Sequence, residues 1–198
     1  MIGILGGVGS GKSSVVRGIS GLDLVIIDAD RIGHQVLREQ RIREQLRTLF
    51  GDSIFDQQGH VDRGRLAGLV FAESREGLQN RKQLEQIVHP AIRAEVIRQI
   101  QQAPQEADAV ILDAALMLEA GWADVCQHLI FIDTPRALRE SRVKAGRGWS
   151  ADELQRREAS QWDIDLKRRQ ADYVVENSDD LPSASDRLEK VLRMLIRP

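Results

Sequence analysis

A glycine-rich segment near the start of the chain has the spacing of a phosphate-binding loop. Residues 6–13 read Gly-Gly-Val-Gly-Ser-Gly-Lys-Ser and directly follow the apolar run Ile2–Leu5. Glycine permits the positive φ values at which successive backbone N–H groups point inward around an anion, and the start of a following helix adds further donors. In this motif the lysine reaches the β- and γ-phosphates and the last hydroxyl is a ligand for Mg²⁺. The segment therefore predicts a nucleoside triphosphate site, with Ser13 as metal ligand, formed by Gly7, Val8, Gly9, Ser10, Gly11, Lys12, Ser13 and Ser14.

Two carboxylates come at the end of the second predicted strand. Asp28 and Asp30 follow the apolar run Leu24–Ile27, and side chains two residues apart on a strand point to the same face. Because ligands bind at the carboxyl edge of a parallel sheet, we expect both carboxylates to face the γ-phosphate. Asp30 is the candidate catalytic base and a metal ligand, and Asp28 should lie nearer the loop. The alternative for either residue is a cap on the helix that follows.

A third carboxylate and two arginines complete the candidate site. Asp113 closes the run Ala109–Asp113, where a P-loop enzyme carries an acidic residue that supports Mg²⁺, although a plain turn is the alternative. Arg142 and Arg147 lie in the segment 136–169, in which ten Lys or Arg residues oppose six Asp or Glu. An arginine that closes over the triphosphate neutralises the transferred group, and the glycines on both sides of Arg147 suit a hinge. Most of the other basic residues there are interpreted as solvated helix faces.

A parallel sheet is needed to bring these residues together. Several apolar runs are continuous rather than alternating, which is typical of strands buried on both faces. Helical patterns between them predict an α/β, doubly wound, three-layer domain with a five-stranded parallel sheet. The predicted strands are Ile2–Leu5, Leu24–Ile27, Val110–Leu112, Leu129–Ile132 and Tyr173–Val175.

The two longest gaps between predicted strands should hold insertions. The gap at 31–108 exceeds what a crossover helix needs, so we expect a helical subdomain, with Asp62 capping one helix and Pro90 breaking or kinking another. A second insertion follows the fourth strand, where Ser150-Ala151-Asp152-Glu153 has the sequence of a capping box. The expected division of the single domain 1–198 is a core at about 1–34, 105–135 and 171–198, a helical substrate-binding insertion at about 35–104, and a lid at about 136–170.

Composition narrows the classes of function. The net charge of the 198 residues is −2, so the overall charge does not indicate binding to nucleic acid or to a membrane surface. No apolar stretch approaches transmembrane length, and the first apolar run lacks the basic region of a signal peptide. Cys126 is the only cysteine, so no intramolecular disulfide can form. We therefore expect a cytoplasmic protein that acts on a small molecule.

Two other chemistries find no support in the sequence. A regulatory GTPase needs the motif Asn/Thr-Lys-x-Asp after a strand in order to recognise guanine. The segment at the end of the fourth predicted strand, Ile132-Asp133-Thr134-Pro135, lacks the lysine of this motif. The four histidines share no metal-ligand spacing. A small-molecule kinase, in contrast, explains the glycine loop, the carboxylates, the helical insertion and the basic segment together.

Over nearly its whole length the chain resembles the dephospho-CoA kinase family. The matching stretches are Gly6–Ser14, Ile27–Asp30, Gly59–Arg63, Leu84-Glu85 with His89-Pro90, Leu112–Glu119, Arg142 with Arg147-Gly148, Gln161, and Ala171–Val175 with Asn177. The resemblance implies a P-loop kinase fold and transfer of the ATP γ-phosphoryl group to the ribose 3′-hydroxyl of dephospho-CoA, the last step of coenzyme A synthesis, with Mg²⁺. Another small-molecule P-loop kinase, with a nucleoside monophosphate or sugar-acid acceptor, is the alternative.

The resemblance also implies roles for particular residues. It makes Asp30 the base, Gly9–Ser14 the ATP loop and Arg147 the lid arginine, and it makes the first insertion the CoA-binding part. Lys12, from the loop motif, and Arg142, from the basic segment, are the further catalytic candidates. Ala115 stands where the family usually has proline, which puts the placement of the substrate in question. The residues implied to contact the acceptor are Asp28, Arg63, His89, Pro90 and Leu116.

Overall fold

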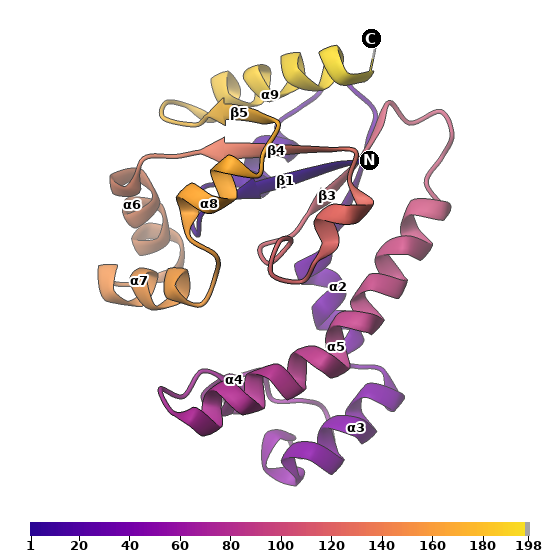
Figure 1. Cartoon of the computed structure of the whole chain (residues 1–198), viewed down its shortest axis with the longest axis vertical. Coiled ribbons are helices and arrows are strands. Elements are labelled where there is room, and N and C mark those ends of the chain that lie inside the picture. The colour runs from indigo at the N-terminus through magenta and orange to yellow at the C-terminus, as the bar shows by residue number, and fades with distance from the viewer. Residues whose placement is uncertain (197–198) are drawn as a thin grey trace. The chain divides into compact units, whose positions relative to one another are not determined.

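The computed structural model describes residues 1–196 and contains a five-stranded parallel sheet (Figure 1). The spatial order is β2-β3-β1-β4-β5, and every neighbouring pair is parallel. The α/β prediction and the five predicted strands are therefore confirmed. From the central β1 the chain goes to one side for β2 and β3 and to the other for β4 and β5, so a ligand crevice is expected at its carboxyl end. The strands are β1 (Ile2–Gly6), β2 (Leu24–Asp28), β3 (Ala109–Asp113), β4 (His128–Asp133) and β5 (Tyr173–Glu176).

The chain forms two compact units. The first comprises Met1–Asp28 and the chain from Gln102 onward, and the second is Ala29–Gln101. The first unit holds the whole sheet together with α1 (Lys12–Arg17), the 3₁₀ turn η2 (Trp122–Val125), α6 (Arg136–Arg147), α7 (Ala151–Ala159), α8 (Ile164–Arg169) and α9 (Leu181–Ile196). In residues 1–196, none of the helices has the length and apolar character needed to cross a membrane.

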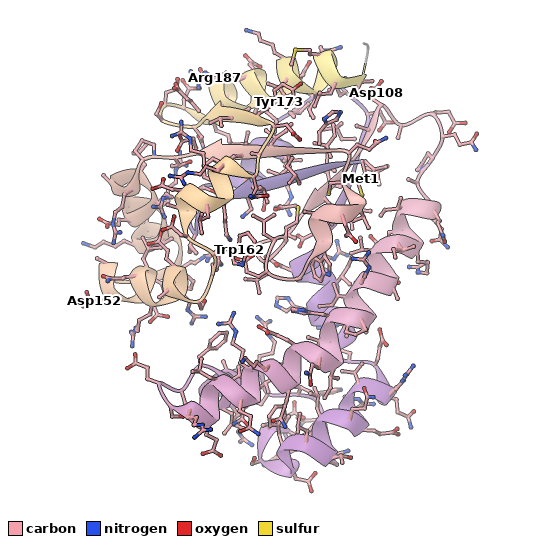
Figure 2. The ribbon with its side chains drawn as sticks, viewed as in Figure 1. Met1, Asp108, Asp152, Trp162, Tyr173 and Arg187 are labelled. Atoms are coloured by element: carbon pink, nitrogen blue, oxygen red, sulfur yellow. The ribbon has the colours of Figure 1, made fainter. Side chains whose placement is uncertain are left out.

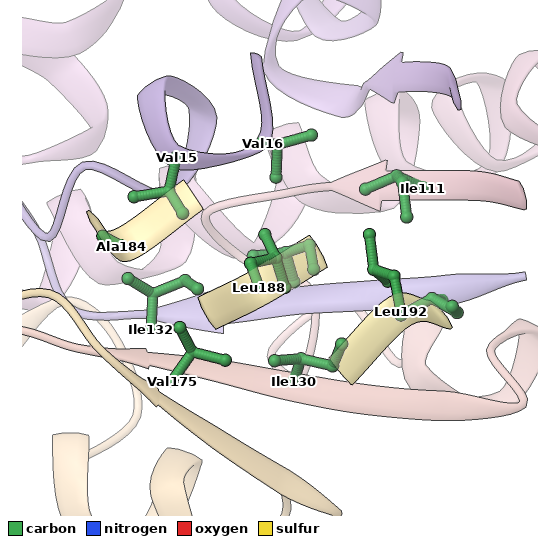
Figure 3. Packing of buried hydrophobic residues seen from close by; sticks show 11 residues of the cluster. Val15, Val16, Ile111, Ile130, Ile132, Val175, Ala184, Leu188 and Leu192 are labelled. Atoms are coloured by element: carbon green, nitrogen blue, oxygen red, sulfur yellow. The ribbon is translucent and has the colours of Figure 1, made fainter. Parts of the chain in front are cut away.

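The core of the first unit lies between the sheet and two helices. Leu188 and Leu192 of α9 are fully buried against Ile130 of β4 and against α1 (Figure 3). Val191 and Leu195 pack beside them, so the apolar stripe of the last helix is core. Burying one such side chain stabilises the fold by about 1.5–3 kcal/mol, which explains why α1 and α9 hold together on one face of the sheet.

Gly3, in the middle of β1, leaves no room for a side chain. A Cβ placed there would lie 2.7 Å from the Met117 sulfur and 2.8 Å from the Cys126 sulfur. We expect Gly3→Ala to lower the free energy of unfolding by about 1–3 kcal/mol, the usual cost of overpacking a core. Gly146→Ala in α6 is the matched control, because nothing lies within 4 Å of a Cβ at that exposed helical site. Chemical denaturation of both variants measures the difference in their free energies of unfolding. Equal denaturation midpoints would show that a side chain can be accommodated at position 3 of β1.

The second unit consists of helices packed around its longest member. Its elements are α2 (Ala29–Val36), α3 (Gln40–Phe50), the 3₁₀ turn η1 (Asp52–Ile54), α4 (Arg63–Val70) and α5 (Arg75–Gln101). Asp62 caps α4 as predicted, since its carboxylate accepts the N–H groups of Gly64 and Arg65 at 2.9 and 3.0 Å. In the first unit, one of the two hydrogen bonds of the predicted capping box is present. The Ser150 hydroxyl accepts the Glu153 N–H at 3.2 Å at the start of α7.

Of the two outcomes predicted at Pro90, a break or a kink of the helix, the break is wrong. Helix α5 runs through this proline without interruption for 27 residues. Proline removes one N–H donor from a helix and costs about 3 kcal/mol in the interior. Helices α2, α3 and α4 all contact α5, and this tertiary packing, which a local sequence pattern does not reveal, outweighs the local cost.

Candidate active site

The glycine-rich loop after β1 has the backbone conformation that its sequence predicts. Gly9 and Gly11 have φ values of 76° and 78°, a region that side-chain-bearing residues rarely occupy. A Cβ at Gly9 would also lie 2.7 Å from Cγ1 of Val143 and 3.0 Å from the Arg139 carbonyl oxygen. Helix α1 then begins at Lys12, and no side chain caps it. The loop is therefore shaped by close packing, and no side chain occupies the N–H groups at the start of α1.

Three side chains from distant parts of the chain hold one carbonyl group of this loop. The Ser10 carbonyl oxygen accepts hydrogen bonds from Thr134 Oγ1 at 2.9 Å, Asn177 Nδ2 at 2.7 Å and Arg142 Nη1 at 3.2 Å. Thr134 and Asn177 follow β4 and β5 and are buried. Because donors anchored at two strand ends fix it, the loop is preorganised before any nucleotide binds.

Ser13 and Asp113, the residues predicted to bind Mg²⁺ with Asp30, contact each other directly. The Ser13 hydroxyl donates a hydrogen bond to Oδ2 of Asp113, which is buried at the end of β3. One hydroxyl and one carboxylate suit Mg²⁺, which commonly takes its other ligands from water and substrate phosphates. In residues 1–196, no three His, Cys, Asp or Glu side chains gather into a metal site of their own. The residues present thus fit a metal shared with bound phosphates.

Asp28 and Asp30 do not lie together on a strand, so that part of the prediction is wrong. β2 ends at Asp28, and Asp30 lies in the first turn of α2, in the second unit. A carboxylate in the first turn is favoured by the helix dipole, so Asp30 suits the position that it occupies in α2. Asp28 pairs in register with Asp113 of β3, and its carboxylate accepts a hydrogen bond from Arg17 at 3.3 Å. Asp28 therefore lies at the same carboxyl edge of the sheet as the Ser13–Asp113 pair.

The two candidate arginines of α6 have different surroundings. Arg142 donates to Asn177 Oδ1 at 3.3 Å in addition to the Ser10 carbonyl, so its guanidinium lies at the loop. Arg147 is the last residue of α6 and stacks on Trp149, with 4.7 Å from its guanidinium carbon to the ring centroid. Gly148, with φ 67°, ends the helix between them. Among the residues described, hydrogen bonds join Arg142 but not Arg147 to the loop.

Arg139 is a buried cation that the sequence analysis missed. Its side chain donates to the carbonyl groups of Val8 at 3.3 Å and Thr134 at 3.2 Å, and it forms an ion pair with Glu158 of α7. Most basic residues of this segment are predicted to be solvated, yet only 4% of Arg139 is exposed. Its spacing of three from Arg142 could have shown that both lie on one face of the helix.

Lys167 of α8 is a second buried cation without an assigned role. Its ammonium group lies 2.8 Å from Glu119 Oε1, and it donates to Gln161 Oε1 at 2.9 Å and to the Ala115 carbonyl at 3.3 Å. Burial lowers the pKa of Lys167, the contact with Glu119 opposes that shift, and the positive charge of Lys12 adds to it. The lysine therefore lies within electrostatic reach of the loop.

The loop and the helices after β4 enclose a pocket of about 370 Å³. Gly7 and Val8 line it together with Arg139 and Lys167. Trp162, labelled in Figure 2 between α7 and α8, also lines it, and its backbone N–H donates to the Glu119 carboxylate at 2.7 Å. Glu158 and Asp163 line the pocket as well, and both buried cations have carboxylate partners, so the lining is of mixed charge.

The residues implied to contact the acceptor lie in both units. Leu116 belongs to the turn after β3, next to the Ala115 carbonyl that Lys167 holds. Arg63 begins α4, while His89 and Pro90 lie on α5 of the second unit. Burial lowers the pKa of His89, which favours its neutral form.

Comparison with known proteins agrees with this geometry. A model of the family described as dephospho-CoA kinase matches residues 1–183. A dephospho-CoA kinase of Corynebacterium diphtheriae is 33% identical over 197 residues, covering 98% of this chain and 94% of the relative. One of Rhodopirellula baltica is 36% identical over 179 residues, covering 90% and 82%.

Solved structures support the same assignment. A crystal structure of a Thermus thermophilus protein has a TM-score of 0.82 and 32% identity, covering 98% of this chain and 96% of the other. The dephospho-CoA kinase of Campylobacter jejuni has a TM-score of 0.71 and 25% identity, covering 99% and 96%. The shikimate kinase of Acinetobacter baumannii, at 17% identity and a TM-score of 0.50, shares the fold alone. By sequence and by structure, this chain belongs to the dephospho-CoA kinase family.

Proposed function

We propose that this protein transfers the γ-phosphoryl group of ATP to the 3′-hydroxyl of the ribose of dephospho-CoA, which gives coenzyme A and ADP. Membership of the family supports the choice of acceptor. The observation that carries the chemistry is the direct contact between Ser13 and Asp113 beside a loop fixed through the Ser10 carbonyl. Such a loop binds and orients phosphates, which is most of what phosphoryl transfer requires of a protein.

Each residue of the site receives one task in this proposal. The loop from Gly7 to Ser14 binds the triphosphate through its backbone, and Lys12 neutralises charge on the β- and γ-phosphates. Ser13 and Asp113 hold Mg²⁺, which when bound supplies further charge neutralisation. Arg142 holds the loop and the nucleotide, and Arg147 contacts the transferred group. Asp30 orients the acceptor hydroxyl and accepts its proton late in the reaction.

The cellular compartment and the kind of partner proposed for the protein follow from its composition. A single cysteine fits a reducing compartment, and we infer that the protein works in the cytoplasm. The partner is a small anionic acceptor rather than nucleic acid, in keeping with a net charge of −2.

A coupled assay of ADP release tests the acceptor. The protein is given ATP, Mg²⁺ and, separately, dephospho-CoA, AMP, CMP, shikimate or gluconate at equal concentration. We expect the highest kcat/KM with dephospho-CoA by a wide margin. Turnover confined to another acceptor would contradict the proposed function, and shikimate is an apt comparison because its kinase shares the fold.

Asp30→Asn should lower kcat roughly 10²–10⁴-fold, the range for loss of a general base, with a much smaller change in the ATP KM. The reason is that the amide still occupies the site but cannot accept the proton of the acceptor hydroxyl. Asp28→Asn is the matched control, since Asp28 lies at the strand edge and pairs with Arg17. Steady-state kinetics at saturating Mg²⁺ compare the two. A larger loss of kcat in Asp28→Asn would mean that the roles of the two carboxylates are reversed.

A further inference from the structure

Arg139 of α6 touches the glycine-rich loop with its side chain and with its backbone. Its Nη1 donates to the Val8 carbonyl at 3.3 Å, and its Nε donates to the Thr134 carbonyl at 3.2 Å. A Cβ added to Gly7 would lie 3.1 Å from this Nη1, and one added to Gly9 would lie 3.0 Å from the Arg139 carbonyl oxygen. The loop therefore packs closely against this one residue.

The charge of Arg139 is already neutralised within the protein. Glu158 of α7 accepts a hydrogen bond from Nη1 and forms an ion pair with the guanidinium group. Both residues belong to the first unit, and Arg139 is buried. A buried cation is strongly destabilising once its carboxylate is removed, so the pair has to be considered together. Glu158 thus fixes Arg139 against the loop, and the guanidinium is not a free charge for a ligand.

The hydrogen bond to Val8 also orients the peptide group that joins Val8 to Gly9. This peptide is planar and trans, so its C=O and its N–H point in opposite directions. Because the carbonyl is directed at Arg139, the Gly9 N–H is directed away from Arg139, and within residues 1–196 this N–H makes no hydrogen bond. A carbonyl that accepts from a charged donor also polarises its peptide, which makes the N–H a stronger donor. Arg139 therefore acts on a loop donor from the other side of the peptide.

We propose that Arg139, held by Glu158, is a positioning residue for the nucleotide, an inference that rests on the proposed function for the identity of that nucleotide as ATP. Arg139 fixes the peptide between Val8 and Gly9 so that the Gly9 N–H donates to a phosphate oxygen. That hydrogen bond exists before transfer and during it. Its loss therefore weakens ATP binding and raises the ATP KM, with little effect on kcat.

Replacing the whole ion pair tests this role without leaving a buried charge behind. In the double variant Arg139→Met with Glu158→Leu, apolar side chains of similar size take the place of the pair, an exchange that proteins often tolerate. Titration calorimetry measures the Kd for ATP and Mg²⁺ without acceptor, and thermal denaturation measures stability. We expect a folded protein with the Kd for ATP raised roughly tenfold, the scale of one charge-assisted hydrogen bond. The kcat at saturating ATP and the KM for dephospho-CoA should stay within about twofold.

Arg139→Lys is a second variant that keeps the positive charge beside Glu158, so it should fold even if the double variant does not. An ammonium group lacks the separate nitrogens with which the guanidinium reaches the Val8 and Thr134 carbonyls. We therefore expect it to restore little of the ATP affinity. Parent affinity for ATP in either folded variant would overturn the proposed role. A loss of kcat as large as the loss of affinity would overturn it as well, because Arg139 would then act in the chemical step.

Arg136→Gln is the matched control. Arg136 lies three residues earlier on α6, and its Nη1 is 3.9 Å from the Glu158 carboxylate, but in the described part of the chain no hydrogen bond joins it to the loop. This variant should keep the parent Kd for ATP. Because ATP binding is measured without acceptor, the test does not depend on turnover. Failure of the unaltered protein to phosphorylate dephospho-CoA would contradict the proposed function instead, so the two failures are distinct.

Discussion

Lys12→Ala should abolish turnover, with kcat lower by roughly 10³-fold or more, while the protein stays folded. The lysine is expected to neutralise charge that develops on the transferred group, and losing such a contact costs several orders of magnitude in rate. Its side chain makes no hydrogen bond or ion pair in the part of the chain that the structure describes. Its charge disfavours the charged form of the nearby Lys167, so its removal relieves a repulsion.

Thermal denaturation without ATP should therefore show no large loss of stability in Lys12→Ala. Lys190→Ala, on the exposed side of α9, is the matched control and should keep both rate and stability. Appreciable activity left in Lys12→Ala would contradict the assignment of residues 6–13 as the working phosphate loop.

Arg147→Ala should reduce kcat by roughly 10²–10⁴-fold, on the scale of lost charge stabilisation in the transition state. In the structure its guanidinium stacks on Trp149, so we propose that it reaches the triphosphate only when the segment after β4 closes. Nucleotide affinity without acceptor should change little, because the loop supplies most of that binding. Arg147→Lys should restore little activity, since an ammonium group cannot form the paired contacts of a planar guanidinium.

Arg142 competes with Arg147 for this role and should behave differently when replaced. It already donates to the Ser10 carbonyl and to Asn177, so Arg142→Ala should loosen the loop and raise the ATP KM. Single-turnover kinetics of both alanine variants separate a loss in chemistry from a loss in binding. Should Arg147→Ala transfer phosphate at the parent rate, its proposed role in closure is wrong.

Sequence patterns predicted the elements that position the site because their signals are local. Continuous apolar runs identified the strands, and the loop glycines required φ values that other residues rarely adopt. Asp62 marked the start of α4 through a capping contact within three residues. Asp113 could be placed beside the glycine-rich loop because parallel strands present their carboxyl ends at one edge of the sheet, and its contact with Ser13 agrees with that placement.

Other features depend on packing between distant segments and were not predictable. Pro90 lies inside a continuous helix because three neighbouring helices stabilise it. Lys167 reads as one of three consecutive basic residues, yet it is buried against Glu119, 48 positions earlier in the chain. Burial of a charge becomes favourable only when its partner is in place, and a sequence pattern on one helix does not show the partner.

Identification of the reaction product tests the central proposal most directly. The protein is incubated with ATP, Mg²⁺ and dephospho-CoA, and the products are separated and examined by ³¹P NMR beside authentic coenzyme A. The proposed function predicts ADP and coenzyme A in equal amounts, with the new phosphate monoester on the ribose 3′-hydroxyl. Release of ADP with dephospho-CoA left unchanged, or a phosphate on any other hydroxyl, would contradict it.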